Sequence, residues 1–182
     1  LIDNQTNPTI APYAKTGETE FRVTAKTKNP HEAEALLKPT LDKLYGLLGG
    51  YIYAEGEDAS LQKTVVSLLC EHKKTVTFAE SCTGGLLAKK ITDVPGSSEC
   101  FNCSYVTYSN GQKEKILGVS RRTLDEYGAV SPQTALEMCR GAKNVSGADI
   151  AISVTGIAGP GGGTPDKPVG LVYIGICTDS VW

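Results

Sequence analysis

The sequence predicts a layered α/β protein, in which an α/β/α domain follows a small α+β domain. Over residues 58–182, short apolar runs of strand length alternate with segments of helical period, the pattern of a layered α/β sheet. Residues 1–57 contain one run of period two and one long helical pattern, and they end in an acidic turn. The 182 residues suffice for one full domain and a smaller one.

The first domain, residues 1–57, is expected to be a small α+β unit of KH type with an N-terminal linker. Residues 20–26 alternate between apolar and polar, which is typical of a half-buried strand. A leucine-rich helical pattern begins at Pro30 and stops at a pair of glycines. Pro39 within it predicts a kink or a break, because proline removes a helical hydrogen bond. The expected linker, strand, helix and short strand lie at residues 1–16, 20–26, 30–48 and 51–53.

The second domain, residues 58–182, is expected to alternate helices and strands. Ser60 is a suitable N-cap for its first helix. The sequence stops at Trp182 directly after a strand, with no closing helix, so we expect this domain to be truncated. The expected helices lie at residues 61–69, 86–91, 111–117, 120–127 and 131–145, and the expected strands at 75–79, 105–108, 150–154 and 169–177.

Composition and charge argue against two classes of partner. The 18 basic and 20 acidic residues give a net charge of −2 and a pI near 5.7. Domains that wrap nucleic acid usually run basic, so no nucleic-acid partner is expected. No apolar run approaches the roughly 18 residues of a membrane span, and the first residues lack the pattern of a signal peptide. We therefore expect a cytoplasmic protein with a small-molecule partner and no membrane association.

The six cysteines are scattered, unlike the dense cysteines of small secreted domains, and ordinary reduced thiols are expected. Cys100 and Cys103 form the one closely spaced pair. A zinc site would need two more ligands at a matching spacing, which His31 and His72 do not supply. A structural or redox role for the pair is the less favoured alternative.

Ser81 lies where a strand is expected to turn into a helix. Ligands of open α/β sheets gather at the carboxyl ends of strands. Free backbone N–H groups of Cys82, Thr83 and Gly84 can bind an anion or a developing oxyanion there. Gly84 and Gly85 let a substrate approach the backbone closely. The alternative is that Ser81 only caps the helix and the glycines only form the turn, and from spacing alone this is the commoner arrangement.

A serine nucleophile needs a base. His31 falls in the first domain and His72 near the end of a surface-like helix, so a Ser-His-Asp triad is not expected, and the rival nucleophile Cys82 lacks a nearby histidine too. Tyr108 lies at a strand end and Lys113 on the turn after it. Lysine serves as a base when burial lowers its pKa. The alternative is that Lys113 is a solvated helix lysine, which composition alone favours.

A glycine-rich loop, residues 155–163, follows the apolar strand at 150–154. Backbone N–H groups in such a loop can surround a phosphate. The loop is not a P-loop, because no Gly-Lys-Ser/Thr follows. Prolines at 160, 165 and 168 prevent the immediate helix of a dinucleotide-binding fingerprint. A nucleotide phosphate or ribose site and a plain flexible loop both stay open.

Four blocks stand in a specific order and spacing: Ala79-Glu80-Ser81-Cys82-Thr83-Gly84-Gly85, Thr107-Tyr108-Ser109-Asn110, Gly128-Ala129-Val130-Ser131, and Ser153-Val154-Thr155-Gly156-Ile157-Ala158-Gly159-Pro160-Gly161-Gly162. They resemble the carboxy-terminal domain of the CinA family, the competence/damage-inducible protein family, whose stand-alone relatives are nicotinamide mononucleotide deamidases. The resemblance covers roughly residues 60–182. Residues 7–14 and the unit after them are similar to the KH-type middle domain of long CinA proteins.

The resemblance implies hydrolysis of the carboxamide of nicotinamide mononucleotide to nicotinic acid mononucleotide and ammonia, in pyridine nucleotide salvage and without a metal or cofactor. The nucleophilic serine of the family matches Ser81, and its assisting tyrosine and lysine match Tyr108 and Lys113. The family also has an arginine, in a Gly-Asp-Arg segment that this sequence does not reach, and its members point to a homo-oligomer such as a dimer. The implied substrate-binding residues are Cys82, Thr83, Gly84, Gly85, Thr155, Gly156, Ile157, Ala158 and Gly159.

Two alternatives belong to other functional classes. The first is a nucleotide-binding module without turnover, or an inactive fragment that lacks the arginine; in it Lys113 stays protonated and solvated. The second is a nucleic-acid protein, since KH-type folds often bind RNA. The lack of a basic patch and of a Gly-x-x-Gly loop in residues 17–60 argues against it.

Overall fold

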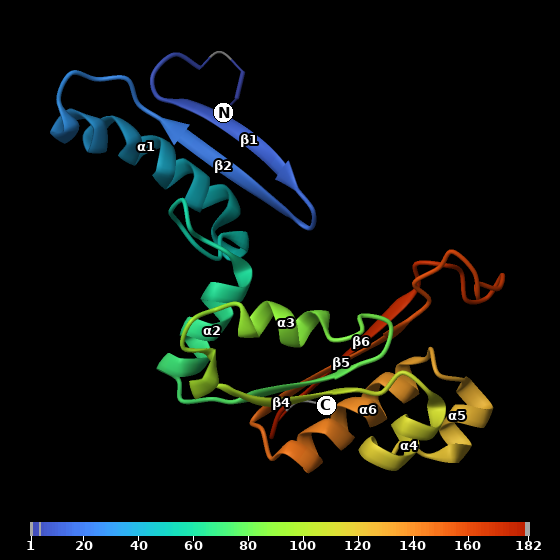
Figure 1. Ribbon diagram of the computed structural model, residues 1–182. Helices are drawn as coiled ribbons and strands as arrows, with labels where there is room; N and C mark the ends of the chain where they lie inside the picture. Colours follow the sequence, from blue (N-terminus) through green and yellow to red (C-terminus); the bar gives the residue numbers. More distant parts are fainter. Residues whose placement is uncertain (1, 4, 181–182) are drawn as a thin grey trace. The chain divides into compact units, whose positions relative to one another are not determined.

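The computed structural model describes residues 2, 3 and 5–180 and divides the chain into two compact units, Leu1–Glu57 and Asp58–Trp182, which are described separately (Figure 1). The predicted fold class is confirmed: the first unit is a small α+β unit and the second a layered α/β/α unit. Within the described residues, no helix combines the length and the apolar character that crossing a membrane requires.

The first unit is a two-stranded β-ribbon next to one long helix. Asn29 caps the helix, because its side chain accepts the backbone N–H of His31 at 3.0 Å. Strands β1 and β2 pair antiparallel, and Ile10 on β1 and Leu44 on the helix are both buried. The elements are β1 (Thr9–Lys15), β2 (Glu18–Thr24), α1 (Pro30–Leu48) and a 3₁₀ turn, η1 (Gly49–Tyr51).

Two predictions for this unit are wrong. Residues 9–15, expected as part of a linker, form β1; Pro12 is tolerated there because the ribbon has only edge strands, where a missing N–H need not break a ladder. Residues 51–53, expected as a strand, begin in η1 and pair with no strand of the described residues. Pro39 does not end α1, since its position is exposed and the helix continues to Leu48.

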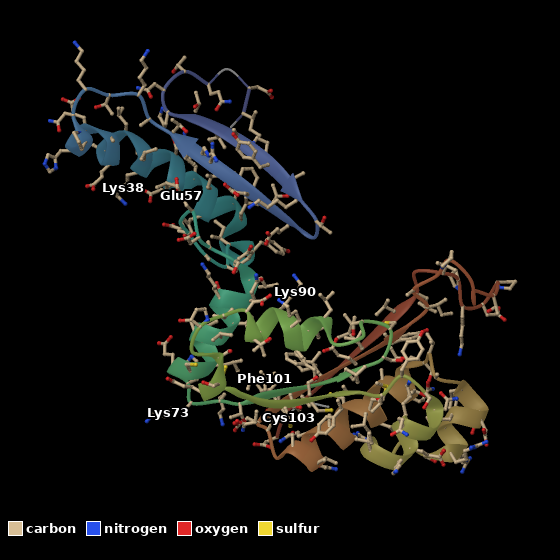
Figure 2. All side chains as sticks on the ribbon, viewed as in Figure 1. Lys38, Glu57, Lys73, Lys90, Phe101 and Cys103 are labelled. Atoms are coloured by element: carbon tan, nitrogen blue, oxygen red, sulfur yellow. The ribbon has the colours of Figure 1, made fainter. Side chains whose placement is uncertain are left out.

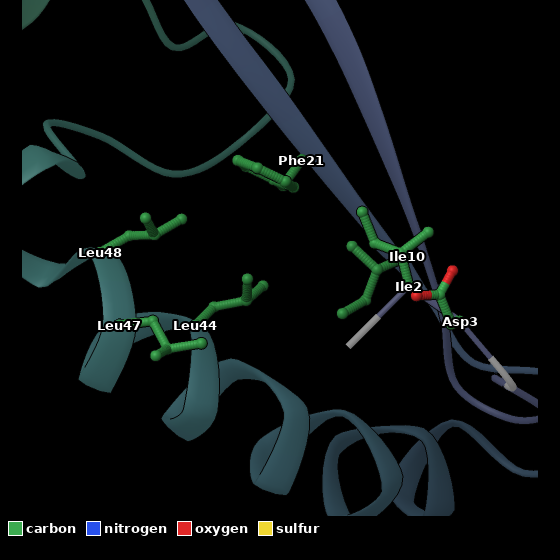
Figure 3. A pocket seen from close by; sticks show the side chains of 7 residues that line it. All are labelled: Ile2, Asp3, Ile10, Phe21, Leu44, Leu47 and Leu48. Atoms are coloured by element: carbon green, nitrogen blue, oxygen red, sulfur yellow. The ribbon is translucent and has the colours of Figure 1, made fainter.

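An apolar hollow of about 370 Å³ lies between the ribbon and α1 (Figure 3). Hydrophobic side chains supply nearly all of its wall, and a single carboxylate lies at its edge. Its lining residues are Ile2, Asp3, Ile10, Phe21, Leu44, Leu47 and Leu48.

The second unit is a four-stranded sheet between two layers of helices. Strand β3 runs parallel to both β4 and β5, and β6 runs antiparallel to β5, in the spatial order β4-β3-β5-β6. The strands are β3 (Val76–Glu80), β4 (Phe101–Val106), β5 (Ile150–Gly156) and β6 (Val172–Cys177). The helices are α2 (Leu61–Glu71), α3 (Leu86–Thr92), α4 (Asn110–Leu117), α5 (Arg121–Tyr127) and α6 (Pro132–Ser146), with a 3₁₀ turn, η2 (Ser97–Glu99).

Helices α2 and α3 cover one face of the sheet, and α4, α5 and α6 cover the other (Figure 1). Successive residues of β3 serve both cores: Phe78 packs with Val66 and Ile91, whereas Ala79 packs with Met138. Because β3 is buried on both faces, its five residues are all buried and show no polar alternation.

The predicted helices of this unit match the observed ones within a few residues, but β4 was placed too late. It spans Phe101–Val106 instead of residues 105–108. The backbone N–H of Thr107 still donates to the Glu80 carbonyl at 2.9 Å, after which the chain turns toward α4. Ser109 caps that helix, with its hydroxyl accepting the N–H of Gln112 at 3.3 Å. Residues 107–109 are therefore a connection that leads from the sheet edge into a helix.

Candidate active site at the carboxyl ends of β3 and β4

The structure brings together Ser81 and Lys113, two of the three predicted catalytic residues. The Lys113 Nζ atom lies 3.0 Å from Ser81 Oγ, and it donates to the carbonyl oxygens of Thr107 at 2.7 Å and Tyr108 at 3.0 Å. Ser81 is 7% exposed and Lys113 is completely buried. The expectation of a solvated helix lysine therefore does not describe Lys113.

Local structure explains this meeting. Ser81 follows β3 directly, and its N–H donates to the Val154 carbonyl of β5 at 2.9 Å, which fixes it at the sheet edge. Lys113 lies in the first turn of α4, directly after the connection from β4. Because parallel strands end at the same edge, the start of α4 lies beside the end of β3.

Burial lowers the pKa of Lys113 from its usual value, because removal from water penalises the charged ammonium. The nearby Cys82 acts weakly in the opposite direction. Among the ion pairs of the described residues, none involves Lys113. Burial without a counter-ion among the described residues therefore shifts the protonation equilibrium of Lys113 toward the neutral amine.

The turn from β3 to α3 has two glycines with positive φ, Gly84 at +62° and Gly85 at +102°. Gly84 donates its N–H to the Ser81 carbonyl at 3.2 Å, so this group is not free. The N–H groups of Cys82 and Thr83 have no oxygen acceptor among the described residues, and both act to lower the pKa of the Cys82 thiol. Of the N–H groups expected to receive an oxyanion, these two are the ones available.

Cys82, the rival nucleophile, is half-buried. Burial raises the pKa of its thiol, and this effect outweighs the opposing influence of the two N–H groups and Lys113. A thiol with a raised pKa is mostly protonated near neutral pH, and the protonated form is a poor nucleophile.

The third predicted catalytic residue, Tyr108, meets Lys113 only through its backbone. Its carbonyl accepts from the Lys113 amine, while the residue as a whole is 76% exposed. The phenol therefore lies at the surface beside the pair, and the structure does not bring it into hydrogen-bond contact with Ser81 or Lys113.

The predicted glycine-rich loop begins at the same edge of the sheet, next to Ser81, but no hydrogen bond of the described residues joins it to the side chain of Ser81 or Lys113. Thr155 adjoins Val154 and donates its hydroxyl to the Ala129 carbonyl at 2.7 Å. A Cβ atom at Gly156 would lie 2.7 Å from the Leu171 carbonyl, so close packing explains this glycine. The three residues after it, Ile157, Ala158 and Gly159, lead into the loop that returns to β6.

Sequence reasoning missed two features of the site. Glu80, the last residue of β3, is completely buried and binds backbone N–H groups of the following turn and helix. Thr107 supplies a carbonyl to Lys113, while its hydroxyl is buried without a partner, as is that of Thr83. A charged residue that ends an apolar strand just before a Gly-Gly turn was the available signal for Glu80.

No group of three or more histidine, cysteine or acidic side chains within the described residues is arranged to bind a metal ion. Cys100 and Cys103 form no disulfide. Cys100 is buried just before β4, and Cys103 lies on β4, where Figure 2 labels it together with Phe101. The Cys103 thiol lies 3.4 Å from the Tyr105 hydroxyl.

Family comparisons cover nearly all of the chain. Residues 58–181 match the family described as "CinA C-terminal domain", and residues 1–54 match that described as "Damage-inducible protein CinA KH domain". Among curated relatives, a putative competence-damage inducible protein of Clostridium acetobutylicum is 51% identical over 177 residues, which are 97% of this chain and 43% of that protein. A CinA-like protein of Kosmotoga olearia is 52% identical over 176 residues, which are 97% of this chain and 42% of that protein. The chain thus spans less than half the length of these relatives.

Solved structures are similar as well. A competence/damage inducible protein from Agrobacterium tumefaciens matches with a TM-score of 0.65 and 45% identity, over 66% of this chain and 73% of that one. A CinA superfamily protein from Escherichia coli matches with a TM-score of 0.62 and 32% identity, over 70% of this chain and 77% of that one. The matched blocks, the fold and these relatives agree, and the chain belongs to the CinA family of competence/damage-inducible proteins.

Proposed function

We propose that this chain hydrolyses the carboxamide of nicotinamide mononucleotide to nicotinic acid mononucleotide and ammonia, with Ser81 as the nucleophile and Lys113 as the base. The observation that carries the proposal is the buried Lys113 amine, 3.0 Å from the Ser81 hydroxyl and without a counter-ion. The family resemblance suggests this substrate, and the proposal includes a role in cytoplasmic pyridine nucleotide salvage.

The three contacts of the Lys113 amine can also be met by a neutral amine, which the lowered pKa of Lys113 favours, and in which the Ser81 hydroxyl becomes the donor. An uncharged Lys113 amine has two hydrogens and one lone pair. The carbonyls of Thr107 and Tyr108 can only accept, so they take both hydrogens. The lone pair is then left for the Ser81 hydroxyl, which donates its proton toward Nζ. This is the arrangement that a general base needs.

The proposed reaction has two halves. Ser81 Oγ attacks the carboxamide carbon while its proton passes to Lys113. The oxyanion of the tetrahedral intermediate then accepts hydrogen bonds from the N–H groups of Cys82 and Thr83. The Lys113 ammonium then gives the proton to the leaving nitrogen. Ammonia departs, and the acyl group stays bound to Ser81 as an ester. In the second half a water molecule gives a proton to Lys113 and attacks the ester. Lys113 then passes this proton to Ser81 Oγ as the ester bond breaks, and the released acid loses its own proton to the solvent.

The remaining site residues bind the substrate in this proposal. Tyr108 orients Lys113 through its carbonyl, and its exposed side chain is proposed to contact the bound substrate from the surface. The turn glycines Gly84 and Gly85 allow close approach of the carboxamide. The glycine-rich loop that starts at Thr155 contacts the ribose or phosphate.

The test is ammonia release from nicotinamide mononucleotide by the purified chain. Wild type releases ammonia, and Ser81→Ala reduces the rate about 10³-fold or more, with the mononucleotide still bound. Ser153→Ala is the matched control, because Ser153 is also buried on the sheet but its hydroxyl donates to the Ala135 carbonyl at 2.6 Å. If wild type binds the mononucleotide without releasing ammonia, the chain is a binding module; if Ser81→Ala keeps full turnover, serine is not the nucleophile.

A further inference from the structure

Glu80 is an ionisable side chain with no exposed surface, and its carboxylate accepts hydrogen bonds from the β3–α3 turn and from the first turn of α3. Its Oε2 atom accepts the N–H groups of Gly85 at 3.0 Å and of Leu87 at 3.1 Å, and its Oε1 atom accepts that of Ala88 at 3.0 Å. The ion pairs of the described residues do not include Glu80. Three backbone donors therefore take the place of the cation that a buried carboxylate usually needs.

The start of α3 differs from the starts of three other helices in this unit, α2, α4 and α6. Helices α2, α4 and α6 are capped from outside by the hydroxyls of Ser60, Ser109 and Ser131. Helix α3 instead has Gly85 at the N-cap, which offers no side chain. The N–H groups of its first turn donate to Glu80, the last residue of the preceding strand. A serine cap accepts a hydrogen bond from one backbone N–H group, whereas the Glu80 carboxylate accepts from three.

The position of that turn decides what surrounds the nucleophile. Ser81 is the residue next to Glu80, and the five residues from Ser81 to Gly85 form the whole connection to α3. Glu80 and the Ser81 carbonyl take up the N–H groups of Gly85 and Gly84, whereas the N–H groups of Cys82 and Thr83 act on the Cys82 thiol and have no oxygen acceptor among the described residues. The charge of Glu80 is also felt at the site, since it acts to raise the pKa of the Cys82 thiol.

We infer that Glu80 is a positioning residue for the proposed reaction: its carboxylate fixes the β3–α3 turn so that Ser81 Oγ faces Lys113 and two backbone N–H groups remain free for the oxyanion. The inference rests on the proposed function. It also has a consequence for the substrate. Because the carboxylate occupies the amino end of α3, this end does not bind the phosphate, which must lie elsewhere in the site.

The experiment compares Glu80→Gln with Glu137→Gln. Glutamine at 80 keeps the size of the side chain but turns one acceptor oxygen into an NH₂ group that faces N–H donors. Glu137 is the matched control, because its carboxylate also binds the start of a helix, accepting the Ser120 N–H at 2.7 Å and the Thr123 hydroxyl at 2.6 Å, but it lies at α5. Thermal unfolding of each variant shows that assays are made on folded protein.

Two readouts are needed. The first is the hydrolysis of nicotinamide mononucleotide, for which Glu80→Gln should lower kcat about 10- to 100-fold with KM within about 3-fold of wild type, since misplaced groups act mainly on the transition state. The second is labelling of Ser81 by a fluorophosphonate, in which the serine oxygen bonds to phosphorus, fluoride leaves and the serine proton passes through Lys113 to water. Labelling should slow by a similar factor, and Glu137→Gln should match wild type in both assays.

The outcomes separate this inference from the proposed function. If wild type labels at Ser81 but does not hydrolyse the mononucleotide, the substrate is wrong, and slow labelling of Glu80→Gln still supports the positioning role. If folded Glu80→Gln labels and turns over like wild type, the positioning role is overturned. Wild type that neither labels nor hydrolyses overturns both. Should glutamine prevent folding, Glu80→Asp, which keeps the charge but shortens the side chain, carries the same comparison.

Discussion

The Lys113 amine lies 3.0 Å from the Ser81 hydroxyl although 32 residues separate them in the sequence. In the sequence alone, Ser81 could be an ordinary helix cap and Lys113 an ordinary solvated helix lysine. What sets the pair apart is that the amine has no exposed surface and, in the part of the chain that the structure describes, no carboxylate partner. It has two carbonyl acceptors, and the serine hydroxyl is its third contact.

Replacement of Lys113 by methionine tests its proposed role as the base. Methionine fills similar space but has no proton acceptor of the required strength, so we expect kcat to fall about 10²- to 10⁴-fold. The carbonyls of Thr107 and Tyr108 lose their donor, and the free energy of unfolding should fall by about 1–3 kcal/mol. Lys115→Met, on the exposed side of the same helix, is the control and should change neither quantity. Retention of turnover by Lys113→Met would exclude lysine as the base.

Two variants of Tyr108 separate the roles of its hydroxyl and its ring. Because the residue is 76% exposed and meets Lys113 through its carbonyl, Tyr108→Phe should keep kcat within about 10-fold of wild type. Tyr108→Ala removes the exposed ring, which is a proposed substrate contact, and should raise KM more than it lowers kcat. Steady-state kinetics with nicotinamide mononucleotide measure both. A loss of kcat in Tyr108→Phe as large as that in Lys113→Met would instead assign the phenol a direct part in proton transfer.

Asp149 provides a test of stability at the opposite end of the strands. Its carboxylate accepts from the Lys74 amine at 2.8 Å and from the N–H and hydroxyl of Thr75, both at 2.9 Å, and these bonds hold its pKa well below the usual 3.8. A pKa lowered by folding stabilises the protein above the unfolded value, and this stabilisation is lost as the pH falls below about 3.8.

Asp149→Asn should therefore lower the free energy of unfolding by about 2 kcal/mol at pH 7. The difference from wild type should shrink as urea unfolding is repeated below pH 3.8. Lys74→Met, which removes only the exposed partner, should lower the free energy of unfolding less than Asp149→Asn does, because solvent screens the charge of an exposed lysine. A difference between Asp149→Asn and wild type that stays constant with pH would show that the charge of Asp149 contributes nothing.

Gly141 limits how closely α6 approaches α4. A Cβ atom at this position would lie 1.9 Å from the Leu117 carbonyl oxygen, and a backbone atom cannot move aside cheaply. Gly141→Ala should destabilise the second unit by about 3 kcal/mol or more. Gly111→Ala is the matched control: on α4 nothing lies within 4 Å of the new atom, and alanine should stabilise by about 0.5–1 kcal/mol. Thermal unfolding decides, and equal melting temperatures for the two variants would contradict the packing argument.

The local pattern predicted most of the fold because each element has its own signals. Ser60 was expected to cap α2 and does so, with its hydroxyl accepting the Lys63 N–H at 3.3 Å. The prediction failed where pairing decides. Residues 9–15 form a strand because β2 lies beside them and pairs with them. Residues 51–53 do not form a strand, because no strand of the described residues lies beside them to pair with.

Residue types and their order determined by themselves the α/β class, the strand-to-helix turn at Ser81 and the family to which the chain belongs. Tertiary structure alone decided that Lys113 is buried against that serine, that the Tyr108 phenol is exposed and that Glu80 turns inward. The physical reason is that strand and helix patterns depend on neighbours a few residues away. The state of an ionisable group depends on solvent access and on partners that only the folded chain brings within 3 Å.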